Sequence, residues 1–113
     1  MQLRTITAAQ LVSVQVMEDR IDAASAIQFK ERMRDIVQDD APRIVLDLAQ
    51  VQFLDSSGLG AIVAVKKLLG PDRTLELAGL TATVEKVFRL TRMDTIFTIH
   101  ATLDAAVANA VKA

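Results

Sequence analysis

The chain has no cysteine, which excludes a disulfide framework, a thiol nucleophile and thiolate metal sites. It has no tryptophan or tyrosine, and aromatic residues make up only 4% of it, which argues against base-stacking platforms for single-stranded nucleic acid. The longest strongly apolar run, Leu59 to Val65, is far shorter than the ~20 residues that span a bilayer. The first residues lack the basic start and long apolar core of a signal peptide. We therefore expect a cytoplasmic protein without direct membrane insertion.

A surplus of charge of one sign is also missing. The 13 basic and 14 acidic residues are interspersed, so there is no electrostatic footprint for nucleic acid or an anionic membrane. Hydrophobic residues make up 51% of the chain, which is enough to predict a folded core rather than disorder. A chain of 113 residues accommodates one core, so we expect a single domain over residues 1–113 that is a monomer when free.

Hydrophobic periodicity predicts the elements of the first half. Two runs rich in aliphatic and β-branched residues, Leu3–Ile6 and Leu11–Val16, predict a hairpin of strands. From Asp22, apolar residues recur every three or four positions, which predicts an amphipathic helix of about four turns with Asp22 as its N-cap. The run Ile44–Leu48 is apolar on both faces of the pleat, which is typical of a central strand with parallel neighbours.

In the second half, Ser57–Leu69 is almost wholly apolar and predicts a helix that is either buried nearly all round or has one face free for a partner. Gly70 ends this helix. The remaining expected elements are a strand over 74–77, a helix capped by Thr81 with Val84, Val87, Phe88 and Leu90 on one face, a strand over 96–99, and a helix capped by Thr102. This order predicts an α/β fold with a single mixed β-sheet of about five strands and about four helices.

The junction Phe53–Gly60 carries a carboxylate, two hydroxyls and two glycines between a strand and a helix. Free N–H groups at a helix start attract negative charge, so Ser56 stands where a phosphate is favoured. Helix capping explains Asp55 and Ser56 without any further function. It does not explain Gly58 and Gly60, each of which costs about 0.5–1 kcal/mol relative to alanine in a helix. We interpret the two glycines as bare backbone that lets another molecule approach the serines.

Catalysis by the chain itself has little support. His100 is the only histidine, and its place among short apolar elements favours a surface or loop position. A hydrolase built on Ser56 and His100 needs a nucleophile elbow, which is missing. There is also no phosphate-binding GxxxxGK[ST] or GxGxxG loop and no cluster of metal ligands. We therefore expect no enzymatic activity, no cofactor and no metal.

The segment Val51–Gly60, which follows Ile44–Leu48, resembles the phosphorylation region of anti-sigma factor antagonists, the single-domain members of the STAS family. The resemblance extends over nearly the whole chain in length, in the order of elements and in the late segment Thr81–Phe88. It implies a STAS fold and a binding protein.

In that family the first serine after the aspartate is phosphorylated by an anti-sigma factor that is also a serine kinase. Unphosphorylated, the antagonist binds this anti-sigma factor and frees the sigma factor; phosphorylation ends the binding, and a phosphoprotein phosphatase restores it. On this chain the resemblance implies phosphorylation of Ser56. The positions that it assigns to partner binding are Asp22, Asp55, Ser57, Gly58, Leu59 and Gly60.

Two positions depart from the family pattern, since Asp19 and Arg92 stand where many members have glycine. The first affects the turn before Asp22, and the second affects the loop after the third helix. A different function of the same fold is also open. In that alternative the protein is an adaptor within a larger assembly, such as a phospholipid-transport ATPase complex or a stress-signalling scaffold, and docks through Leu59–Leu69 without a phosphorylation cycle.

Overall fold

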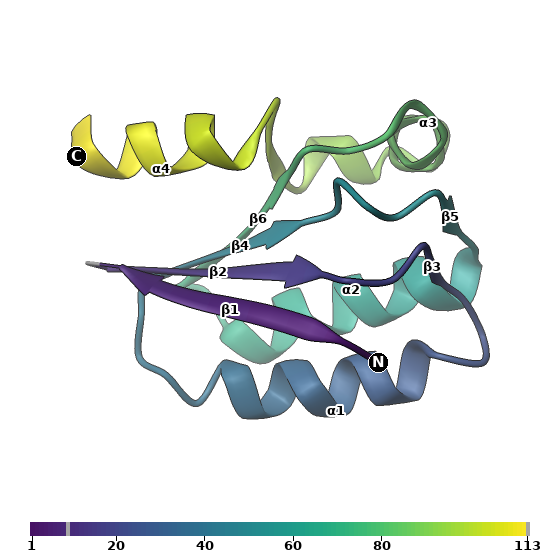
Figure 1. Cartoon of the computed structure of the whole chain (residues 1–113), viewed down its shortest axis with the longest axis horizontal. Helices are drawn as coiled ribbons and strands as arrows, with labels where there is room; N and C mark the ends of the chain where they lie inside the picture. The colour runs from purple at the N-terminus through teal and green to yellow at the C-terminus, as the bar shows by residue number, and fades with distance from the viewer. Residues whose placement is uncertain (9, 113) are drawn as a thin grey trace.

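A computed structural model of the chain describes residues 1–8 and 10–112 and is built around a five-stranded mixed sheet (Figure 1). The strand order is β1-β2-β4-β6-β7, with β1 antiparallel to β2 and the other neighbours parallel. The strands are β1 (Leu3–Ala8), β2 (Leu11–Val16), β4 (Arg43–Asp47), β6 (Thr74–Ala78) and β7 (Thr98–His100). The predicted hairpin and the predicted mixed sheet are both confirmed.

A second, two-stranded sheet was not predicted. It pairs β3 (Arg20–Ile21) with β5 (Phe53–Leu54) in parallel. The expectation of a single sheet is therefore wrong in this detail. Because β5 lies directly before α2 in the chain, its pairing with β3 helps to position the start of that helix.

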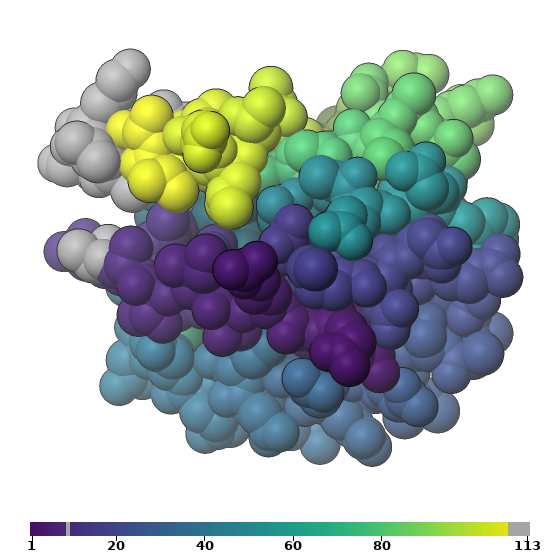
Figure 2. Space-filling model, viewed as in Figure 1, coloured from purple at the N-terminus to yellow at the C-terminus, as the bar shows by residue number. Residues whose placement is uncertain are grey.

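Within the described residues, four helices cover the two faces of the main sheet. They are α1 (Ala26–Ile36), α2 (Ser56–Leu69), α3 (Ala82–Leu90) and α4 (Leu103–Lys112), with a 3₁₀ turn η1 (Met93–Thr95) after α3. Figure 1 shows α1 and α2 on one side of the sheet and α3 and α4 on the other. The edge strand β1 is almost wholly exposed, and Figure 2 shows it open between the α1 side and the α4 side.

The larger part of the core lies between the sheet and the α1–α2 layer. On this face, Val14 of β2 pairs with Leu46 of β4, which in turn pairs with Leu77 of β6, and all three are fully buried. The opposite face carries a smaller cluster of Leu11, Val45, Ala78 and Ala106 under α4. Because β4 contributes to both clusters, the prediction of a central strand covered on both faces is confirmed.

A buried polar network lies on the α4 face. Both oxygens of Glu76 accept hydrogen bonds from Arg43, at 2.7 and 2.6 Å, and Glu76 also accepts one from Thr74. A further hydrogen bond of 2.7 Å joins Glu76 to Nε2 of His100. Burial by itself raises the pKa of Glu76, but the hydrogen bonds from Arg43, His100 and Thr74 and the charge of Arg43 outweigh it and lower this pKa to about 2. Arg43 also donates to the carbonyl of Ala106, so the network ties β4 and β6 to α4.

Two sequence-based expectations about single residues are wrong. His100 lies neither in a loop nor on the surface, because it is in β7 with only 8% of its surface exposed. Leu90 is 70% exposed, whereas Val84 and Phe88 are fully buried. The reason is helical geometry: Leu90 follows Phe88 by two residues and so lies about 200° round the helix from it.

Candidate functional site

The start of α2 is organised by the side chain of Asp55. This residue is the N-cap of the helix, and its Oδ1 accepts a 2.9 Å hydrogen bond from the N–H of Gly58. Capping of this helix by Asp55 is therefore confirmed. Ser56 and Ser57 are the first two residues of the helix, and both are exposed. The N–H groups of a first helical turn have no partner within the helix, so Ser56 lies at the positive end of the helix dipole.

The second oxygen of Asp55 reaches a different part of the chain. Its Oδ2 accepts a 3.1 Å hydrogen bond from the N–H of Ala23, in the turn before α1. The backbone N–H of Asp55 also donates to the carbonyl of Ile21, at 3.4 Å. One carboxylate thus joins the start of α2 to the approach to α1, and the pairing of β3 with β5 holds the same two segments together.

Asp22 lies in this turn but is not the N-cap of α1. Its Oδ1 accepts from the N–H groups of Ala24 and Ser25, at 3.0 and 3.2 Å, whereas α1 begins only at Ala26 with Ser25 as N-cap. The prediction that Asp22 caps the helix is wrong, because a turn separates it from the first helical residue. Its carboxylate satisfies backbone donors of that turn instead, and Asp55 binds the same turn through Ala23.

The two glycines of α2 serve different purposes. Gly58 is buried, and a Cβ atom added to it would lie 2.2 Å from the carbonyl oxygen of Ile21 and 2.7 Å from Cδ1 of Leu54. The interpretation of Gly58 as an approach to the serines is therefore wrong, since glycine is needed there for close packing against β3. Gly60 is exposed, with no atom within 4 Å of such a Cβ, so its surface is open. Leu59 is half-buried against the main core.

The structure brings all of the predicted residues into one region, but it does not expose all of them. Ser56, Ser57 and Gly60 are exposed, Asp22, Asp55 and Leu59 are half-buried, and Gly58 is buried.

Two neighbours of this region, Arg20 and Phe53, were not among the predicted partner-binding residues. The guanidinium carbon of Arg20 lies 4.9 Å from the centroid of the Phe53 ring, and its Nε lies 3.6 Å from Oδ2 of Asp22. Phe53 is 42% exposed, and an aromatic residue as the first member of the junction is the one signal in the sequence that points to it. Strands of two residues are too short to show a period.

Within the part of the chain that the structure describes, the site lacks a cluster of metal ligands. In residues 1–8 and 10–112, no three His, Cys, Asp or Glu side chains are grouped in a way that could hold an ion. In the same part of the chain, no helix is long and apolar enough to cross a membrane. The chemistry available at the start of α2 is that of an exposed hydroxyl beside a fixed carboxylate.

Comparison with known proteins identifies the family. The STAS domain model matches residues 5–106. The anti-sigma-F factor antagonist RsfB of Mycobacterium tuberculosis is 27% identical over 104 residues, which cover 90% of this chain and 85% of that protein. The crystal structure of an anti-sigma factor antagonist from Mycobacterium paratuberculosis has a TM-score of 0.86 at 26% identity and covers 96% of this chain and 92% of its own.

The Bacillus protein SpoIIAA shares the fold in two states. Its unphosphorylated form, described as an anti-sigma factor antagonist, has a TM-score of 0.78 at 20% identity and covers 99% of this chain and 98% of its own. Its phosphorylated form has a TM-score of 0.70 at 18% identity and covers 96% and 99%. The family model spans most of the sequence, and the TM-scores show that the chain shares its overall fold with these structures. The chain belongs to the STAS domain family.

Proposed function

We propose that this protein is an anti-sigma factor antagonist that is switched off by phosphorylation of Ser56. Its partner is an anti-sigma factor with serine kinase activity; binding releases a sigma factor, and a phosphoprotein phosphatase restores the binding-competent form. The observation that carries the proposal is the placement of Ser56, exposed as the first residue of α2 and held there by Asp55. The similarity to the mycobacterial antagonists supports the choice of partner.

Electrostatics support a switch at this position. A phosphate adds about −1.5 to −2 charge, next to the carboxylate of Asp55. Asp55 binds backbone N–H groups through both of its oxygens, so it cannot turn away without loss of these hydrogen bonds. At a packed interface, like-charge repulsion and desolvation oppose association, and about 2.7 kcal/mol is enough for a 100-fold loss of affinity.

The fold itself is expected to tolerate the phosphate. A negative charge at the start of a helix is stabilising by about 0.3–1 kcal/mol, and Ser56 is exposed. SpoIIAA has this fold in both its unphosphorylated and its phosphorylated form. Phosphorylation of Ser56 should therefore change binding much more than structure.

Intact-mass spectrometry tests the modification. The protein is incubated with ATP and a candidate anti-sigma factor that has serine kinase activity. We expect the wild type and Ser57→Ala to gain one phosphate and Ser56→Ala to gain none; Ser57 is the matched control because it is the adjacent exposed hydroxyl. A wild type that stays unmodified would favour the adaptor function, and a phosphate on Ser56→Ala would assign the modification to another residue.

Calorimetric binding to the anti-sigma factor tests the charge switch. Ser56→Ala should bind like the unphosphorylated protein, whereas Ser56→Asp places a charge beside Asp55 and should bind at least about tenfold more weakly. Equal affinities of the two variants would refute a mechanism based on charge.

A further inference from the structure

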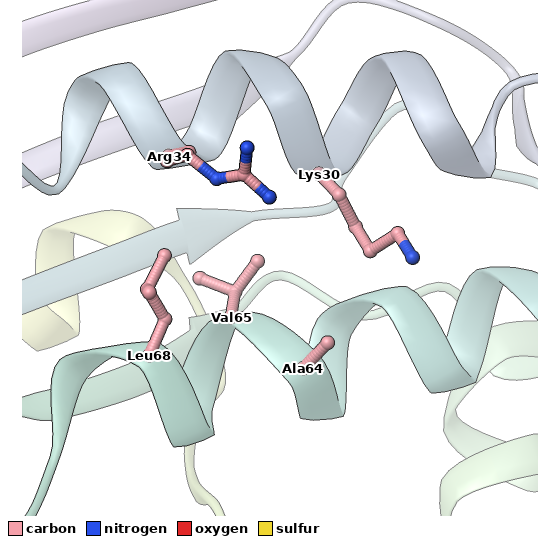
Figure 3. A pocket seen from close by; sticks show the side chains of 5 residues that line it. All are labelled: Lys30, Arg34, Ala64, Val65 and Leu68. Atoms are coloured by element: carbon pink, nitrogen blue, oxygen red, sulfur yellow. The ribbon is translucent and has the colours of Figure 1, made fainter.

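A groove between α1 and α2 lies apart from the phosphorylation site. Its volume is about 100 Å³, and it is lined by Lys30 and Arg34 of α1 and by Ala64, Val65 and Leu68 of α2. Figure 3 shows the side chains of Lys30 and Arg34 extending from α1 toward the three apolar side chains of α2. The volume is well below the roughly 300–1,000 Å³ of a small-molecule site, so the groove suits a single side chain of a larger partner.

The groove combines an apolar floor with two available cations. Val65 is buried, whereas Leu68 is 52% exposed despite its size. Lys30 and Arg34 are exposed, and among the described residues neither has a carboxylate within 4.0 Å. Glu31 precedes Arg34 by three positions and so lies about 60° from it round α1, but no ion pair within 4.0 Å joins the two side chains. Asp35 directly follows Arg34 and lies about 100° away.

The groove continues the surface around Ser56 along α2. Ser57, Gly60, Ala64 and Leu68 follow one another at spacings of three or four, lie on one face of the helix and are all exposed. The helix has 14 residues, so this face is about 20 Å long.

Helix α1 carries a similar row of exposed residues on its side of the groove, and it runs in the same direction as α2. Ile27, which is 65% exposed, precedes Lys30 and Arg34 at spacings of three and four. Figure 1 shows α1 and α2 side by side and running in the same direction, and Asp55 joins their starts through Ala23. The exposed surface is therefore continuous from Ser56 to Leu68 and carries Lys30 and Arg34 beside the apolar side chains of Ile27 and Leu68.

We infer that the groove is a second docking point for the partner and binds an amphipathic acidic segment of it. An apolar side chain of this segment packs on Val65 and Leu68, and its carboxylates pair with Lys30 and Arg34. Two cations on a chain of net charge −1 suit a few carboxylates, whereas nucleic acid or an anionic membrane requires a broad basic surface. The inference rests on the proposed function, because it concerns the same anti-sigma factor.

Charge reversal in the groove provides the test. The full chain carrying Lys30→Glu and Arg34→Glu is compared with a control carrying Arg4→Glu and Lys86→Glu, which reverses two exposed cations on β1 and α3. Affinity for the anti-sigma factor kinase is measured by calorimetry at low and high salt, and folding is checked by circular dichroism. We expect the groove variant to bind about tenfold more weakly and to lose most of the salt dependence, while the control stays within about twofold of the wild type.

The outcomes separate the two proposals. If the groove variant binds like the control while the wild type binds and is phosphorylated on Ser56, the groove inference is overturned and the proposed function stands. If the wild type neither binds nor is phosphorylated, both fail together. A Leu68→Ser variant adds an uncharged readout: it should also bind more weakly, but with the salt dependence of the wild type.

Discussion

Gly58 and Gly60 are two residues apart in α2, yet alanine should have opposite effects at the two positions. At Gly58 the new Cβ lies 2.2 Å from the carbonyl oxygen of Ile21. That carbonyl belongs to the β3 backbone and accepts the N–H of Asp55, so no change of rotamer removes the overlap. Overpacking costs about 1–3 kcal/mol, and a clash with backbone belongs at the upper end. Alanine regains up to about 1 kcal/mol in helix propensity, which leaves a net loss of about 2 kcal/mol.

At Gly60 the only effect of alanine is its higher helix propensity. Gly60 is exposed, and no atom outside the helix's own backbone lies within 4 Å of the new Cβ, so Gly60→Ala should stabilise the protein by about 0.5 kcal/mol. The same chemical change in the same helix should thus separate the two variants by about 2.5 kcal/mol. At roughly 4 °C per kcal/mol for a domain of this size, their melting temperatures should differ by about 10 °C.

Urea denaturation followed by circular dichroism measures both variants against the wild type. Equal slopes of the unfolding free energy against urea would show that only stability has changed. If Gly58→Ala proved as stable as the wild type, β3 would have to move away from α2 without cost, and the packing explanation for Gly58 would be refuted. If Gly60→Ala were destabilising, an unrecognised contact at that position would be required.

Three further predictions concern the stability of the folded protein. Asp55→Ala removes the acceptor of two backbone N–H groups and should lower the unfolding free energy by about 1–2 kcal/mol, with Asp55→Asn intermediate, as measured by urea denaturation. The pKa of Glu76 is lowered from 4.5 to about 2 in the folded protein, so the ionised carboxylate adds about 3 kcal/mol to the free energy of unfolding. This contribution is fully present above pH ~5 and is lost as the pH falls toward 2. Urea titrations should therefore show Glu76→Gln well below the wild type at pH 7 and much closer to it at pH 3; a gap that does not narrow would contradict this linkage. Arg92 has a left-handed backbone with φ 61°, which costs a non-glycine residue about 1–2 kcal/mol, so Arg92→Gly should raise the melting temperature by a few degrees, and a lower value would show that the arginine side chain matters more than the backbone.

The main sheet and the helices were predictable because their patterns are long enough to repeat. The buried residues Ala26, Phe29 and Met33 of α1 follow the helical spacing, and β4 is apolar on both faces because helices cover both. The strands β3 and β5 have two residues each, so no period can reveal them. They form because distant segments meet, and single-sequence patterns do not contain that information.

In the candidate site too, the local features were predictable from the sequence and the features that depend on distant residues were not. Capping by Asp55 is a local interaction over three residues, so the sequence was sufficient to predict it. The role of Gly58 depends on Ile21, and the burial of His100 depends on Glu76, 24 residues earlier in the chain. Arg92 is an instructive intermediate case. The expected glycine was recognised as missing at this position, and the left-handed backbone supplies the reason for the usual residue.

The contacts around Ser56 favour a switch that acts through charge rather than through shape. Asp55 is bound through both oxygens, and Gly58 is packed against β3 so closely that even a methyl group does not fit. The backbone under Ser56 is thus fixed from two directions, while Ser56 itself is exposed at the helix start. A kinase needs the hydroxyl and not the helix to be accessible. In the proposed mechanism the backbone of the junction therefore keeps the same conformation before and after modification, and the negative charge of the added phosphate decides whether the partner can bind.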